Sequence, residues 1–236
     1  MKKIILAILM TFGIFTMVSA DIGVKLGVST QIGSMETSGK EVSSDATVGT
    51  TTSATEEALF GTAGFFIEKD LAFLPGPFGR LSLGYDNIAH DLDLGTQRNA
   101  RAESIGATIA AGGGTVAVTA TDHSLSAEVT GFETFYATLN VTDWLYLKAG
   151  SVTVDVNTKF SGSATSTYAT GHSLDGTVLG FGVEKSSDNG MFFRLEYNDY
   201  SIDGKSVANA GADSKFTATL NDVSGSTGRI SIGKAF

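Results

Sequence analysis

Nine charged side chains in this sequence occupy alternate positions in short stretches whose other positions are apolar. They are Lys25, Glu68, Arg80, Asp86, Lys148, Glu184, Arg194, Glu196 and Arg229. Successive side chains of an extended strand point to opposite faces, so these charges are predicted to share one face. Five cations stand against four carboxylates, although the chain as a whole has a net charge of −9. Charges removed from bulk water must pair, so the pattern predicts an ion-pair and hydrogen-bond network. Two other interpretations stay open: a wide polar face that water solvates, and a gated or selective channel.

No other chemistry is predicted. The three histidines, His90, His123 and His172, have no local motif around them, and the serines and aspartates of their segments are too common to single out a catalytic triad. No two histidines have the spacing of metal ligands. The run Gly112–Gly114 precedes no helix, so it is not a phosphate-binding loop. We therefore expect no enzyme activity, no metal site and no cofactor.

The elements that must position the nine charges are β-strands. Met191, Phe193 and Leu195 alternate with Arg194 and Glu196, for example, and no stretch has a convincing helical period. Counting such alternations predicts eight strands, at 22–32, 59–68, 80–86, 134–141, 145–150, 179–184, 191–198 and 229–233.

The connections between these strands alternate in length. The long ones are 34–57, 91–125, 157–173 and 203–216, and the short ones are 70–78, 142–144 and 186–190. Short turns at one end and long loops at the other are typical of outer-membrane barrels. The sequence therefore predicts an all-β, single closed antiparallel up-and-down transmembrane barrel of eight strands. We interpret 91–125 as an extension of the third and fourth strands above the membrane, with a ten-stranded barrel as the alternative. Glu133 falls on the apolar face of its strand, which predicts a β-bulge nearby.

The start of the chain predicts export. A basic start, an apolar run from Ile4 to Val18 and the small residues Val18–Ala20 form the pattern of a secretory signal peptide. We expect residues 1–20 to be a signal peptide cleaved after Ala20 and residues 21–236 to be the barrel. The acidic balance argues against a nucleic-acid partner. The absence of cysteine excludes disulfides and cysteine-ligated metals.

The C-terminal strand carries a sharper motif. Ile230, Ile232 and Phe236 occupy alternate positions before the end of the chain, and Lys234 departs from this apolar series. The motif resembles the assembly signal of bacterial outer-membrane proteins, and the whole pattern is similar to the small OmpA/OmpX-type and opacity-like eight-stranded barrels. The resemblance implies a location in the bacterial outer membrane. It also implies contact with outer-membrane lipids and recognition of the C-terminal strand by the assembly machinery.

Aromatic residues are predicted to form two interfacial belts. One belt lies near the short turns and comprises Phe78, Trp144, Tyr146, Phe192, Phe193 and Phe236, and the other comprises Tyr85, Tyr197 and Tyr200. The favoured function is a structural or surface-interaction barrel with a side-chain-filled lumen and long external loops. The alternatives are a narrow pore for small or apolar solutes and a secreted, soluble β-sandwich that binds a ligand. The sequence identifies no external ligand or partner.

Overall fold

A computed structural model describes residues 22–43, 52–88, 92–102, 120–161, 168–210 and 216–236. The predicted signal peptide at 1–20 and His90 lie outside these residues. Eleven strands and one short 3₁₀ helix are described. They are β1 (Val24–Ser43), β2 (Thr52–Asp70), η1 (Gly76–Arg80), β3 (Leu81–Ile88), β4 (Leu92–Ala102), β5 (Ala120–Asn140), β6 (Leu145–Ser161), β7 (Gly171–Ser186), β8 (Met191–Ile202), β9 (Lys205–Ala208), β10 (Phe216–Leu220) and β11 (Val223–Ala235). Among the described residues, no helix is long and apolar enough to span a membrane.

Eight of these strands form a closed wall. The antiparallel order is β1, β2, β3, β5, β6, β7, β8 and β11, and β11 pairs again with β1 from Lys25↔Ala235 to Glu36↔Ser224. Because the last strand returns to the first, the wall has no free edge along this stretch, and the predicted eight-stranded up-and-down barrel is confirmed. The soluble β-sandwich is excluded by the same closure.

The other three strands extend the wall. β4 pairs with β5 from Leu92↔Val129 to Ala102↔Ala120, so the described parts of 91–125 lengthen an existing strand pair, as predicted. β9 and β10 pair with each other, and β10 also pairs with β1. The ten-stranded alternative is therefore wrong, because the barrel closes without these strands.

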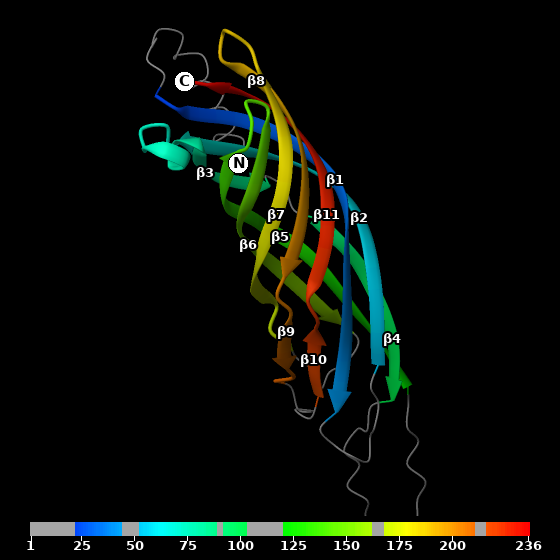
Figure 1. Ribbon diagram of the computed structural model, residues 1–236. Helices are drawn as coiled ribbons and strands as arrows, with labels where there is room; N and C mark the ends of the chain where they lie inside the picture. The colour runs from blue at the N-terminus through cyan, green and yellow to red at the C-terminus, as the bar shows by residue number, and fades with distance from the viewer. Residues whose placement is uncertain (1–21, 44–51, 89–91, 103–119, 162–167, 211–215) are drawn as a thin grey trace, which may run out of the picture.

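The two ends of the barrel differ. The short-turn end, at the top of Figure 1, holds the connections 71–80, 141–144 and 187–190 and the end of β11. The long-strand end, at the bottom, holds β4, β9, β10 and the far ends of β1 and β2. Gly190, with φ +81°, closes the 187–190 turn, where its N–H donates to Ser187 O over 2.9 Å. Ala235 N donates to Gly190 O over 2.8 Å and ties this turn to the last strand.

Several strands are longer than the sequence predicted. β1 continues to Ser43 and β2 begins at Thr52, so most of the expected loop at 34–57 is paired strand. The loops expected at 157–173 and 203–216 also contain strand residues. The prediction failed because alternating Ser, Thr and Gly give no hydrophobic period, although their backbones form the ladder equally well.

The strand register is irregular at the position where the sequence predicts a β-bulge. The pairing of β5 with β6 shifts between Val129 and Gly131, and Glu133 follows this bulge. The shift allows buried Val129 and Phe132 to face the lumen on either side of it, while Glu133 is exposed. The predicted bulge is confirmed.

Candidate functional site: a charged lumen

Arg194 of β8 is the centre of the first ionic cluster, which we name the Arg194 cluster (Lys25, Glu68, Asp70, Glu184, Arg194). Its Nη1 and Nη2 donate to Glu68 Oε1 and Oε2 over 2.6 and 2.5 Å, a bidentate pair. Its Nε donates to Glu184 Oε2 over 2.5 Å, and Lys25 Nζ donates to Glu184 Oε1 over 3.1 Å. Lys25 Nζ also lies 3.8 Å from Asp70 Oδ1. Every charge in this cluster therefore has a partner of opposite sign.

Glu196 of β8 is the centre of the second cluster, the Glu196 cluster (Asp86, Lys148, Glu196, Arg229). Its Oε1 accepts a hydrogen bond from Lys148 Nζ over 2.8 Å and lies 3.7 Å from Arg229 Nη1. Its Oε2 accepts from the Tyr146 hydroxyl over 2.7 Å. Arg229 Nη1 also donates to Asp86 Oδ2. Glu196 thus pairs with both Lys148 and Arg229, and Asp86 pairs with Arg229 as well.

The pairs cross the lumen. Glu68 lies on β2 and Arg194 on β8, with β1 and β11 between them in the wall. Asp86 on β3 and Arg229 on β11 are likewise on strands that do not pair. The side chains of Lys148, Glu68 and Arg194 are no more than 5% exposed. Because these pairs join distant strands inside a closed wall, they fill the lumen and bind its opposite sides together.

Eight of the nine predicted residues lie in these two clusters, and Arg80 does not. Arg80 is exposed at the end of η1, where its Nη1 donates to Val141 O over 3.3 Å. The prediction was wrong for Arg80 because β3 begins at Leu81, so the alternation of the strand does not reach residue 80. Asp70, which the prediction missed, pairs with Lys25 and accepts a hydrogen bond from Ser82 Oγ over 2.6 Å. Its position two residues after Glu68 was the available signal.

Four inward aromatic rings pack beside the charges, each across from a glycine. The pairs in register on neighbouring strands are Phe66 with Gly27, Tyr136 with Gly84, Tyr146 with Gly182, and Phe192 with Gly233. A Cβ at any of these glycines would overlap the facing ring. Arg194 lies 5.0–5.2 Å from the centroids of Phe66, Tyr146 and Phe192, within cation–π distance. The glycines therefore admit the rings, and the rings pack around the guanidinium.

This packing makes the glycines sensitive to substitution. We expect Gly84→Val to lower the free energy of unfolding by about 1–3 kcal/mol, because the added carbons displace the Tyr136 ring in a filled lumen. Urea unfolding in detergent micelles measures the change. Gly228→Val is the matched control on the outer face, where a Cβ meets no atom within 4 Å. Equal losses in both variants would contradict the ring-to-glycine packing.

Little space is left between the charged clusters and the lumen residues toward the long-strand end. A cavity of about 10 Å³ is lined by Gln31, Thr62, Asp86 and their neighbours. That volume is close to the minimum for one water molecule. Thr62 Oγ1 is buried there without a hydrogen-bond partner, which a single water could supply.

The predicted aromatic belts need a correction. Phe78, Trp144 and Phe193 are exposed near the short turns, and Tyr197 is exposed on the outer face of β8. Tyr146, Phe192 and Tyr200 are instead buried in the lumen. These three were assigned to the belts by height alone, and the strand period places them on the inner face.

His172 is not part of the charged lumen, and the side chain of His123 lies outside the described residues. His172 Nε2 lies 2.9 Å from Ala169 O, and His90 lies outside the described residues. Among the described side chains, no group of three or more histidines, cysteines or carboxylates is arranged to hold a metal ion.

Comparison with known proteins leaves the family open. No family model and no curated protein matches the chain. The chain is similar to the solved structure of OprG, an outer-membrane protein of Pseudomonas aeruginosa, at 9% identity and a TM-score of 0.40, covering 92% of this chain and 97% of that one. It is similar to Ail, the attachment invasion locus protein of Yersinia pestis, at 10% identity and a TM-score of 0.29, covering 86% and 98%. At such scores the architecture rests on the strand pairing of this chain.

Fold and site together define a class of protein. It is the small, closed, up-and-down β-barrel whose interior is filled by its own side chains, the architecture of OmpA/OmpX-type proteins. The resemblance predicted from the sequence is confirmed at this level.

Proposed function

We propose that this chain is a bacterial outer-membrane protein with a sealed lumen, whose role is structural or is carried out by its external end. The observation that carries the proposal is the contrast between the two faces of the same strands. The outer face exposes large apolar side chains, such as Phe135 at 60%, Leu179 at 63% and Phe193 at 51%. The inner face of the same barrel holds buried, paired charges, such as Lys148 with Glu196 and Arg194 with Glu68. A surface of this kind is stable against acyl chains and unfavourable in water.

Backbone pairing supports the same conclusion. Hydrocarbon offers no partner to a free N–H or C=O group, so a spanning sheet must close on itself. The closed pairing of β1 with β11 meets this requirement. We also propose that Ile230, Ile232 and Phe236 carry the signal that the outer-membrane assembly machinery reads. Ile230 and Ile232 face outward, 47% and 52% exposed, where another protein can reach them.

The ion pairs favour a sealed lumen over a pore. A conducting path would have to pass Lys148 and Arg194, whose side chains are 1% and 5% exposed. Opening the path would separate charges buried together, which is costly. We expect no catalytic activity.

Three measurements test the proposal. We expect the protein to stay in the membrane fraction until detergent is added, and to migrate differently on a gel before and after heating. In planar bilayers we expect no reproducible unitary current. Release without detergent would refute the membrane assignment, and reproducible current steps would refute the sealed lumen while leaving the membrane assignment intact.

A further inference from the structure

The strands are much longer than a membrane requires. A tilted transmembrane strand needs about 9–11 residues. β1 has 20 residues, β2 has 19 and β5 has 21. The short turns hold these strands together at one end, so the surplus lies entirely at the long-strand end.

The interior changes character along this surplus. Beyond the charged clusters, toward the long-strand end, the lumen is filled by an apolar cluster: Val129, Phe132, Val152, Val154, Leu174, Val178, Tyr200 and Ile202. Met35 of β1, Ile88 of β3 and Val223 of β11 pack against it. This cluster has the composition of a soluble protein's core, and the sequence pattern did not predict it.

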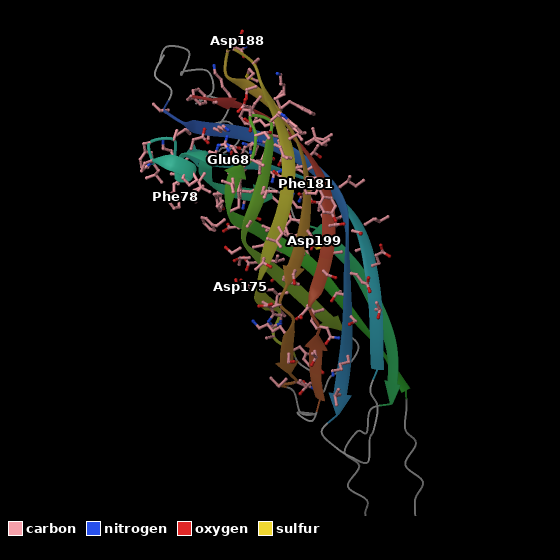
Figure 2. All side chains as sticks on the ribbon, in the orientation of Figure 1. Glu68, Phe78, Asp175, Phe181, Asp188 and Asp199 are labelled. Carbon is pink, nitrogen blue, oxygen red and sulfur yellow. The ribbon has the colours of Figure 1, made fainter. Side chains whose placement is uncertain are left out.

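The outer face changes in the opposite sense at the same level. On β7, exposed Phe181 and Leu179 are followed by exposed Thr177 and Asp175. On β8, Leu195 and Tyr197 are followed by Asp199 and Ser201. Figure 2 shows Asp188 at the short-turn end, Phe181 further along, and Asp199 and Asp175 nearer the long-strand end.

Strand register places the polar outer residues in continuous rows. Asn87, Glu133, Thr153 and Asp175 are paired in turn across β3, β5, β6 and β7. Thr153 Oγ1 donates to Asp175 Oδ1 over 3.1 Å, and Asn87 Nδ2 is 3.5 Å from Glu133 Oε1. A second row joins Asp199, Ser226 and Ser34 on β8, β11 and β1, and exposed Leu59 of β2 interrupts it.

Aromatic pairs lie next to these rows, on the short-turn side. The rings of Tyr85 and Phe135 are 4.9 Å apart, and those of Phe181 and Tyr197 are 5.6 Å apart. Tyrosine is favoured where the hydrocarbon meets the headgroups. The apolar surface therefore ends in aromatic pairs on β3 and β5 and on β7 and β8.

We propose that this one barrel is built for two solvents, and that the membrane surface lies where both faces invert. On the short-turn side of the two polar rows, the wall is apolar outside and charged inside, and its outer face contacts lipid. On the long-strand side of the rows, the extended strands expose their outer face to water and enclose a dry apolar core. This inference rests on the proposed function and deepens it, because it assigns which part of the outer wall contacts lipid.

The absence of cysteine in the chain allows single nitroxide labels to test the boundary. Variants Asp188→Cys, Phe181→Cys, Leu195→Cys, Asp175→Cys and Asp199→Cys, in the full-length barrel reconstituted into phosphatidylcholine vesicles, place labels along the outer wall. Oxygen, which concentrates in lipid, and a water-soluble nickel chelate report the surroundings of each label. We expect oxygen to dominate at positions 181 and 195, and the nickel chelate to dominate at 175, 188 and 199.

Two other outcomes are distinguishable. If positions 175 and 199 behave like 181, lipid also covers the wall at the long-strand end and the inference is wrong, while the proposed function stands. If 181 and 195 behave like 188, the wall does not contact lipid and the proposed function itself fails. Each variant is checked first for the heat-dependent gel shift, which shows that the labelled barrel is folded.

Discussion

Replacing Arg194 with methionine is expected to lower the free energy of unfolding by about 3–5 kcal/mol, because it breaks a buried ion pair. Methionine keeps much of the packing volume, so the loss is mainly that of the charge. Glu68 would lose both bonds of its bidentate pair, and its side chain is 0% exposed. The Tyr136 hydroxyl, 2.9 Å away, would remain as a donor to the orphaned carboxylate. Urea unfolding in micelles, followed by gel mobility, measures the change.

Arg80→Met is the matched control, since it removes the same charge at an exposed position. We expect its effect to be within about 0.5 kcal/mol, as for most surface substitutions. The double variant Arg194→Met/Glu68→Gln is expected to recover part of the stability, because the buried negative charge is removed with its partner. If Arg194→Met proves as mild as Arg80→Met, the cross-lumen pairs do not stabilise the barrel.

Replacing Val178 with aspartate is expected to destabilise the barrel by several kcal/mol, because an unpaired charge would be buried among apolar side chains. Val178 is 0% exposed and belongs to the apolar cluster with Val152, Leu174 and Ile202. The same unfolding measurement applies. Loss of the heat-dependent gel shift is the expected result if the variant does not fold at all.

Thr177→Asp provides the control, because its side chain lies next in sequence but on the exposed outer face. We expect this variant to unfold within about 0.5 kcal/mol of the parent, as a carboxylate in water costs little. Should Val178→Asp and Thr177→Asp be equally stable, the lumen toward the long-strand end contains water and the dry core does not exist.

The period of alternation explains why so much of the barrel could be predicted. On β8, Met191, Phe193 and Leu195 are exposed, and Arg194 and Glu196 are buried, as the sequence predicts. This assignment needs no knowledge of the partner strands, because a strand's side chains alternate whatever it pairs with. The number of strands and the faces of the charged residues follow from it.

The partners of the charges could not be predicted in the same way. Which cation meets Glu68 depends on the tilt and stagger that bring β2 opposite β8, and these are properties of the closed wall. The exchange of Arg80 for Asp70 depends on where β3 begins, because one residue outside the strand loses the alternation. The glycines opposite Phe66 and Tyr136 likewise become meaningful only once the register is known.

The long-strand end of the barrel could not be predicted for a related reason. The expected loop 34–57 is largely strand, but the outward residues of β1 in it are polar except Val42, and only Met35 joins the apolar cluster from β1. The sequence by itself determined that there are alternating strands, that their charged faces are separated from their apolar faces, and that the chain ends in an apolar strand, since each is a local property of residue order. Only the tertiary structure decided which charges pair and where the two faces exchange character, because both depend on how eight staggered strands enclose a common interior.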